Sequence, residues 1–304
     1  MTKEKIFYFN LYIGVFILIA SELLLLLNVP FVKNWFFCLS WWSYILIIDS
    51  LNFRKRKTSQ LYSSLKDFLF MAFISVFLWL IFEIFNLRLK NWSYHNLPAN
   101  LPERWTGYFI GFATVIPALM ETALFIEGLL KINTSKFSIK VTKNLIIISI
   151  LIGFLLIFLF LSFPKQFFAF VWLCFIFLIP PFNYILKNDD FFSDLEKGYP
   201  GRIISWLIAG LIAGFFWEFW NNWALSRWRY NIPYFNFLKV FEMPILGFLG
   251  FPPFALEVFS IYQFIFFIRK KIEKYILLKW ILFFILLLFY TFCFSLIDRF
   301  TLLE

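Results

Sequence analysis

Long apolar stretches without charged residues dominate this sequence, and they limit the folds that the chain can adopt. A helix that crosses a bilayer needs roughly 20 mostly apolar residues, and backbone that faces lipid must satisfy its own hydrogen bonds. The first stretch lacks a small-residue cleavage site and is too long for a removable signal peptide, so we interpret it as an anchor. The sequence predicts nine membrane-spanning helices, at about residues 5–28, 35–52, 67–88, 106–131, 143–163, 166–187, 203–224, 241–268 and 276–298.

The composition agrees with a polytopic, all-α membrane protein. Of the 304 residues, 62% are hydrophobic and only 15% are charged, which argues against a water-soluble fold. The three cysteines, Cys38, Cys174 and Cys293, show neither disulfide nor metal-ligand spacing. The only histidine, His95, excludes sites that need two histidines, such as HExxH zinc sites. We therefore expect neither a metal nor a cofactor.

The basic residues are distributed unevenly between the two sides of the predicted membrane domain. The amino-terminal segment and the loops after the second, fourth, sixth and eighth helices carry 19 of the 28 Lys and Arg residues, and the opposite side carries 9. The positive-inside rule then places the amino terminus in the cytoplasm and the carboxyl terminus outside. The location we expect is a bacterial inner (plasma) membrane, which the resemblance described below implies. Topology and anionic headgroups account for most of the net charge of +10. We expect membrane lipids as partners and no nucleic acid.

One polar motif occurs twice in the chain. Residues 79–121 align with residues 215–257 at a constant offset of 136 positions, and most of the identities are not apolar. Glu83 and Glu218 join the alignment if one residue is inserted before Asn222. The identical pairs are Asn86/Asn222, Leu89/Leu225, Trp92/Trp228, Tyr94/Tyr230, Asn100/Asn236, Gly111/Gly247, Phe112/Phe248, Pro117/Pro253 and Glu121/Glu257.

The duplication extends toward the start of each copy, because residues 42–53 resemble residues 182–192 and align Asp49 with Asp189. Each unit then contains four helices, and the ninth helix is an addition. Since four is an even number, both copies enter the membrane in the same orientation, as in parallel repeats related by an axis along the membrane normal. The predicted domains are 1–133, 141–270 and 275–304, with a polar linker at 134–140.

Carboxyl and amide side chains in the two copies are the candidate functional groups, because ionisable residues inside membrane helices mark functional sites by default. Glu121 and Glu257 each follow a proline by one turn, and Pro117 and Pro253 should kink their helices beside them. The candidate catalytic residues are Glu83, Glu121, Glu218 and Glu257. The candidate substrate-binding residues are Asn86, Trp92, Tyr94, Asn221, Asn222, Trp228 and Tyr230.

Each candidate also has a structural interpretation. The Trp-x-Tyr pairs fit an interfacial aromatic belt, and the asparagines fit hydrogen bonds between helices. Arginines at the outer helix ends could neutralise the glutamates and form a structural ion network; these are Arg88, Arg104, Arg227 and Arg229. We interpret Asp49, Asp189 and Asp190 as solvated boundary charges, and Glu22 is either a hydrogen-bonding residue between helices or a further acid.

The motif FExxNLRLxNWxY, at residues 82–94, resembles a family of bacterial multi-pass membrane proteins with a duplicated repeat. The order of polar helix end, Trp-x-Tyr, Gly, then Pro followed by Glu is similar to the duplicated domain of membrane-integral lycopene cyclases and related carotenoid enzymes. This resemblance implies two parallel copies and a membrane-embedded acid that protonates a polyene, and Glu121 and Glu257 would take that place. The family's Pro-Leu-Glu-Glu is replaced here by PALME and PFALE, which shifts the acid along the helix.

The preferred function is the handling of an isoprenoid or other apolar or amphiphilic lipid by non-redox acid–base chemistry. A protonated glutamate would donate to a double bond while Trp and Tyr faces stabilise the developing cation. A proton- or cation-coupled transporter or channel is an alternative, because the same carboxyls could carry the coupled ion. A non-catalytic membrane scaffold is a third possibility. We expect the duplicated polar residues to line one shared cavity, biased toward the outer side.

Overall fold

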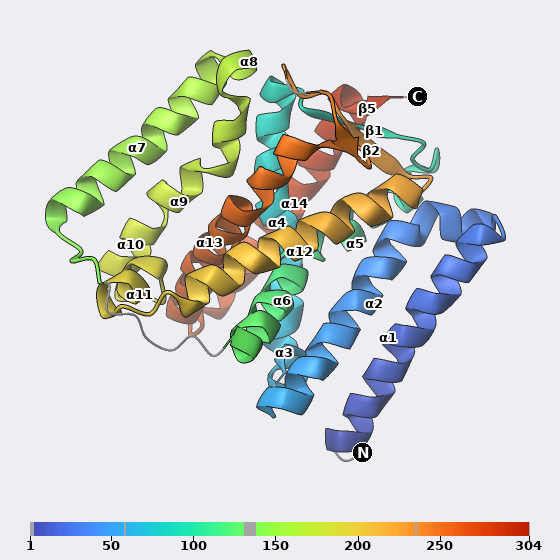
Figure 1. Ribbon diagram of the computed structural model, residues 1–304, viewed down its shortest axis with the longest axis horizontal. Helices are drawn as coiled ribbons and strands as arrows, with labels where there is room; N and C mark the ends of the chain where they lie inside the picture. The colour runs from blue at the N-terminus through green and yellow to red at the C-terminus, as the bar shows by residue number, and fades with distance from the viewer. Residues whose placement is uncertain (1–2, 58, 131–137, 235, 304) are drawn as a thin grey trace.

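The computed structural model describes residues 3–57, 59–130, 138–234 and 236–303, and these residues form an almost entirely helical protein (Figure 1). The all-α class that the sequence predicts is therefore confirmed. The two ends of the chain lie at opposite ends of the helical bundle (Figure 1). Most of the predicted linker at 134–140 falls outside the described residues.

Eight helical segments of the described chain are long and apolar enough to cross a membrane. A bent pair, Pro164–Trp172 and Cys174–Ile185, would be a ninth segment, with an angle of 57° at its break. The eight are α1 (Lys3–Leu26), α2 (Pro30–Arg56), α4 (Leu65–Leu89), α5 with α6 (Leu101–Phe112 and Val115–Leu130), α7 (Lys143–Ser162), α12 (Gly201–Trp223), the 3-10 helix η2 with α13 (Ile245–Gly250 and Phe251–Ile272) and α14 (Ile276–Phe300).

Short elements connect these segments. The bent pair consists of α8 (Pro164–Phe167), the 3-10 helix η1 (Phe168–Trp172), α9 (Cys174–Leu178) and α10 (Pro180–Ile185), and α3 (Gln60–Ser63) and α11 (Phe191–Lys197) lie in connections. Polar caps mark where several helices start: Ser64, Asn100 and Thr142 each accept a hydrogen bond from a backbone N–H in the first turn of the helix that follows.

The helix that carries Glu121 is interrupted where its proline predicts a disturbance. α5 ends at Phe112, and α6 begins at Val115 with Pro117 as its third residue, where no intrahelical N–H is needed. Ser75 of α4 bridges the interruption, because its hydroxyl donates to the carbonyl of Phe112 and accepts from the N–H of Ile116 at 3.0 Å. A neighbouring helix therefore supplies the hydrogen bonds that the broken helix lacks.

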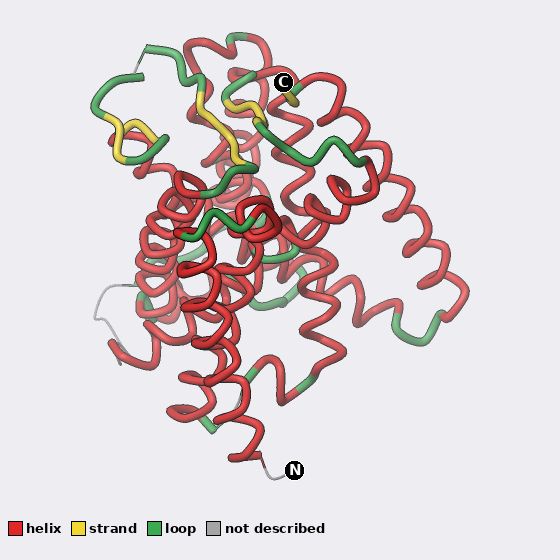
Figure 2. Tube along the Cα trace, turned by 90° about the vertical axis from the view of Figure 1, so that its right-hand side faces the viewer, coloured by secondary structure: helices red, strands yellow, loops and turns green. Residues whose placement is uncertain are grey.

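A three-stranded sheet joins distant parts of the chain, and the apolar pattern did not predict it. The antiparallel strands β1 (Trp92–His95) and β2 (Arg227–Tyr230) are adjacent, and β5 (Leu302–Leu303) pairs with β1 in parallel. The sheet lies at the end of the bundle that carries the carboxyl terminus, as both views show (Figures 1 and 2). A separate hairpin consists of β3 (Lys239–Val240) and β4 (Met243–Pro244).

The pairing of β1 with β2 is symmetric with respect to the duplicated motif. Trp92 lies opposite Tyr230, and Tyr94 lies opposite Trp228. The two Trp-x-Tyr motifs therefore pair with each other, and all four rings are on the same face of the sheet because alternate residues of a strand share a face.

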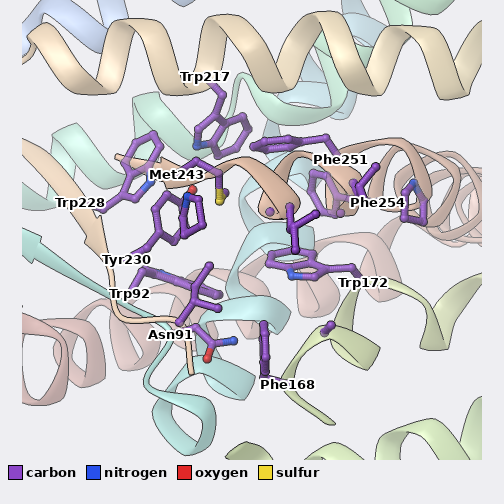
Figure 3. A pocket seen from close by; sticks show the side chains of 18 of the residues that line it. Asn91, Trp92, Phe168, Trp172, Trp217, Trp228, Tyr230, Met243, Phe251 and Phe254 are labelled. Carbon is purple, nitrogen blue, oxygen red and sulfur yellow. The ribbon is translucent and has the colours of Figure 1, made fainter. Parts of the chain in front are cut away.

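Helix α12 packs closely against the start of α13, next to the sheet. A Cβ atom on Gly210 would overlap the carbonyl oxygen of Phe251, so a larger residue could not occupy this position without moving α13. The two helices thus hold the rings at their ends, Trp217 on α12 and Phe251 and Phe254 on α13, close to the sheet (Figure 3).

Candidate functional site

A cavity of about 360 Å³ lies between the sheet, η1, the end of α12 and the start of α13 (Figure 3). We call it the aromatic cavity, because ten of its 21 lining residues are aromatic. Elements from both copies of the motif contribute to it. Its aromatic residues are Trp79, Trp92, Tyr94, Phe168, Trp172, Trp217, Trp228, Tyr230, Phe251 and Phe254, and its other lining residues are Asn91, Ala169, Leu173, Ile232, Met243, Pro244, Leu246, Gly247, Leu249, Gly250 and Pro253.

Three of the residues that line the cavity are exposed at the surface of the protein, and all three are aliphatic. Ala169 of η1 and Leu246 and Leu249 of η2 line it and are themselves exposed, Leu249 to 68%. We call this exposed edge of the cavity its mouth. Its side chains are aliphatic, which suits the passage of an apolar molecule.

Glu83 lies directly behind the aromatic wall. Its Oε1 atom accepts hydrogen bonds from Nε1 of Trp79 at 2.8 Å, from Nε1 of Trp92 at 3.1 Å and from the hydroxyl of Tyr94 at 2.5 Å. Its Oε2 atom has no hydrogen-bond partner among the described residues, although the residue is only 2% exposed. One carboxyl oxygen thus fixes three rings of the cavity wall.

Glu218 repeats part of this arrangement in the second motif. The hydroxyl of Tyr230 donates to its Oε1 at 2.7 Å, and Glu218 is fully buried. Burial and the facing carboxyl raise the pKa of Tyr94 and of Tyr230 well above the usual range of a phenol. Both hydroxyls therefore keep their protons and act as donors to the glutamates.

The two asparagines of the motif hold the turns between helix and strand. Asn86 donates to the carbonyl of Trp92 at 2.9 Å and accepts from the N–H groups of Asn91 and Trp92 at 2.8 and 3.2 Å. Asn221 makes two equivalent bonds, to the carbonyl and from the N–H of Trp228, at 2.9 and 3.0 Å. These side chains satisfy backbone groups and do not line the aromatic cavity.

Asn221, and not Asn222, is therefore the structural counterpart of Asn86. The constant offset of 136 pairs Asn86 with Asn222, but Asn222 is only half-buried and its backbone carbonyl accepts from Arg227 at 3.0 Å. The second turn contains one additional residue, which lies between the asparagine and the strand.

Glu121 and Glu257 lie away from the aromatic cavity, although both are fully buried. Oε1 of Glu257 accepts from the backbone N–H of Phe175 at 2.8 Å, so this carboxyl satisfies the start of α9 in the bent segment. Oε2 of Glu121 accepts instead from Nδ2 of Asn52 on α2 at 2.7 Å. Equivalent glutamates thus have different neighbours, and the structure brings together the Trp and Tyr pairs but not all four acids.

The arginines near the outer helix ends bind other groups. Arg104 forms a two-pronged ion pair with Asp298 of α14, with both N–O distances 2.9 Å, while Arg88 donates to the carbonyl of Leu161. Arg229 faces Glu242 at 3.9 Å. Within the described ranges, no ion pair joins an arginine to any of the four candidate glutamates.

Several wall residues were missed at the level of sequence. Trp217 precedes Glu218 as Phe82 precedes Glu83, so its place next to a repeated acid was an available signal. Trp172 is different, because a single tryptophan in an apolar segment has no pattern that distinguishes it from a residue in contact with lipid. Its ring stacks on Trp92 with the centroids 6.0 Å apart.

Metal-binding groups are not gathered in one place. Among the residues that the structure describes, no cluster of three or more His, Cys, Asp or Glu side chains could hold a metal ion.

Comparison of the chain with known protein families, with curated proteins and with solved structures gives no match.

Proposed function

We propose that this chain is an integral membrane protein that binds an isoprenoid or similar lipid in the aromatic cavity and acts on it by acid–base chemistry without redox change. One observation carries the proposal. Rings from both copies of the motif line the cavity, and buried carboxyls are hydrogen-bonded to its two tyrosines. Such a site combines apolar contact with groups that hold protons.

The binding part of the proposal follows from the wall and the mouth. A volume of about 360 Å³ is near the lower end of the roughly 300–1,000 Å³ found for small-molecule sites. The cavity therefore suits one end of a long lipid, with the remainder leaving between η1 and η2. The rings of the cavity offer aromatic faces on which the unsaturated groups of the lipid can stack.

The chemical part uses the same wall. Addition of a proton to one carbon of a double bond leaves a positive charge on the other carbon, and the faces of Trp92 and Trp172 would stabilise it. Loss of a different proton then gives an isomerised or cyclised product, so no oxidant or reductant is required. The carboxyl of Glu83 or Glu218 is protonated in this step: it passes its proton to the phenol oxygen of Tyr94 or Tyr230 while that hydroxyl passes its own proton to the double bond, so the hydrogen bond between them reverses direction. The carboxylate that results takes up the second proton by the same route.

In this proposal the glutamates behind the tyrosines take the role that resemblance to lycopene cyclases gives to Glu121 and Glu257. The latter two lie outside the aromatic cavity. A carotenoid or another polyene remains the proposed substrate class, because conjugated double bonds offer an extended face to stacked rings.

We further propose nine membrane spans arranged as two like-oriented four-helix repeats and a final helix, with domains at 1–133, 141–270 and 275–304. The antiparallel pairing of β1 with β2 supports this arrangement. A two-fold axis along the membrane normal reverses any direction that lies in the membrane plane, so equivalent strands that run in this plane are antiparallel. Glu121 and Glu257 are each the seventh residue of the helix after an interruption, which also supports it. The excess of Lys and Arg supports a cytoplasmic amino terminus in a bacterial inner membrane.

A proton- or cation-coupled transporter is the second candidate. It is favoured by the buried carboxyls at separate positions along the bundle, with Glu83 and Glu218 behind the aromatic cavity and Glu121 in α6. Carboxyls placed in this way mark proton or ion pathways in membrane proteins.

The binding part is tested by purifying the protein from a carotenoid-producing host and identifying the bound lipids by mass spectrometry. We expect co-purifying isoprenoid in the native protein and at least a tenfold loss in Trp172→Ala. Trp280→Ala is the matched control, because Trp280 is 56% exposed on α14 and lies outside the cavity. Absence of isoprenoid from the native protein, or equal lipid content in both variants, would contradict the proposal.

The chemical part is tested in a host that makes lycopene. We expect the native chain to change the pigment profile and Glu218→Gln to abolish the change while still binding pigment. Glu273→Gln is the control, because the Glu273 side chain is 61% exposed at the far end of α13. An unchanged profile with the native chain argues against carotenoid chemistry, and transport that depends on a pH gradient would favour the second candidate.

A further inference from the structure

A second buried polar site lies between α2 and α6, apart from the aromatic cavity. Asp49 and Asn52 are three residues apart on α2, so they share one face of the helix, and both meet Glu121 of α6. Asn52 donates through Nδ2 to Oε2 of Glu121 at 2.7 Å and to its backbone carbonyl at 2.8 Å. Asp49 therefore lies on the side of α2 that Asn52 turns toward Glu121, and the charge of each carboxyl acts on the other.

This site is sealed from solvent. Asp49 and Glu121 are 0% exposed and Asn52 is 2% exposed, so Asp49 is not the solvated boundary charge that the sequence suggests. One oxygen of each side chain, Oδ2 of Asp49, Oε1 of Glu121 and Oδ1 of Asn52, has no hydrogen-bond partner among the described residues. The other oxygen of Asp49 accepts from the N–H of Leu61 at 3.3 Å.

Arg56 offsets part of the negative charge of the pair, but among the described residues no ion pair joins a Lys or Arg side chain to either carboxyl. Arg56 of α2 is directed to the carbonyl of Leu124 at 3.3 Å and to Glu127 of α6 at 3.6 Å. On the other side along α2, the hydroxyls of Tyr44 and Thr122 bond to each other at 2.8 Å. From α1, which packs on α2, and from α4, α12 and α13, which pack on α6, no described charged side chain forms an ion pair with Asp49 or Glu121.

Two neighbouring carboxyls in a buried site do not both ionise readily without a compensating cation, because each negative charge disfavours the other. Neutralisation of one of them removes the conflict, and the proton then belongs to the pair and not to either residue. We propose that Asp49 and Glu121 form a proton-binding site in which the two carboxyls share one proton, with Asn52 orienting Glu121. The unpartnered oxygens, Oδ2 of Asp49 and Oε1 of Glu121, are the atoms available to hold it.

This site is distinct from the equivalent position in the second motif. Glu257 meets a backbone N–H and not a second acid, so a paired carboxyl site occurs only at the first of these two positions. α2 and α6 both run toward the end of the bundle that carries the amino terminus (Figure 1). The pair therefore holds its proton at a distance from the sheet end, and independently of what the aromatic cavity binds.

The test is infrared spectroscopy of the purified full-length protein, in which the C=O stretch of a protonated carboxyl shifts on exchange into deuterium oxide. We expect a protonated band at neutral pH that is lost in Glu121→Gln and that is lost or moves to a lower titration midpoint in Asp49→Asn. Glu127→Gln is the matched control, because Glu127 lies on the same helix with a 41% exposed side chain. This control should leave the band unchanged.

Two outcomes would overturn the proposal. If neither single variant alters a protonated band, the carboxyls do not share a proton. If sodium raises the melting temperature of the native protein but not of Asp49→Asn, and no band is lost, the same oxygens bind a cation instead. Should Glu121→Gln fail to fold, Asp49→Asn reports on the same band, because it removes the other half of the pair.

Discussion

Removal of one tyrosine hydroxyl should destabilise the protein far more in the second motif than in the first. In Tyr230→Phe, Glu218 loses the one donor that it has among the described residues and is left fully buried without a hydrogen bond from them. In Tyr94→Phe, Glu83 keeps the two indole donors at 2.8 and 3.1 Å. The same chemical change therefore has different consequences at two related positions.

The magnitudes follow from what each glutamate retains. A buried polar group left without a partner costs about 1–3 kcal/mol, and more when it is charged, whereas loss of one bond among several costs about 0.5–1.5 kcal/mol. We therefore expect Tyr230→Phe to lower the free energy of unfolding by about 0.5–1.5 kcal/mol more than Tyr94→Phe does. Since 1.4 kcal/mol corresponds to a factor of ten, the unfolding equilibrium should differ between the variants by up to roughly tenfold.

The assay is reversible unfolding in mixed micelles of increasing denaturing detergent, followed by near-ultraviolet circular dichroism of the tryptophans. Tyr275→Phe is the control, because Tyr275 is 53% exposed in the connection before α14 and should unfold like the native chain. An equal or greater loss in Tyr94→Phe would refute the argument that the two indoles compensate for the missing hydroxyl.

Three further predictions concern the frame around the aromatic cavity. Asn86→Ala leaves two backbone N–H groups and one carbonyl unpaired, whereas Asn221→Ala leaves one of each. Unfolding in denaturing detergent should therefore show a larger loss of free energy of unfolding for Asn86→Ala, about 3 kcal/mol, than for Asn221→Ala, about 2 kcal/mol. Asp298→Ala breaks the ion pair with Arg104, and calorimetry should register a loss near the lower end of roughly 3–5 kcal/mol. Burial and the charges of Arg229 and Arg227 lower the pKa of His95 in the folded protein. As the pH decreases through the usual range of histidine, the imidazole is protonated in the unfolded chain before it is protonated in the folded one, so the stability of the fold decreases. The melting temperature of His95→Gln should lack this part of the pH dependence.

The sequence predicted the elements that depend on local pattern. Charge-free apolar stretches determine where helices can cross lipid, and the predicted span at 106–131 overlaps α5 and α6, whose interruption precedes Pro117 as the chemistry of proline requires. These properties depend on neighbouring residues in the chain, so composition and spacing are sufficient to predict them.

Properties that depend on distant partners were not predictable in the same way. β1 is four residues long, and its partner strand begins at Arg227, so no local periodicity indicates the sheet. Glu121 and Glu257 occupy equivalent positions, but one meets a side chain of α2 and the other a backbone N–H of the bent segment. A motif alignment compares residue types and contains no information on the helix that lies opposite.

The register of β1 on β2 has a consequence for the lengths of the two turns that lead into the strands. A shift of one residue would move Trp92 and Tyr94 to the opposite face of the sheet, away from the cavity. The second turn is longer by one residue than the first, yet Ser93 still lies opposite Arg229. Insertions upstream of the strand can thus be accommodated, whereas an insertion inside either Trp-x-Tyr unit would dismantle the wall that both halves of the protein build together.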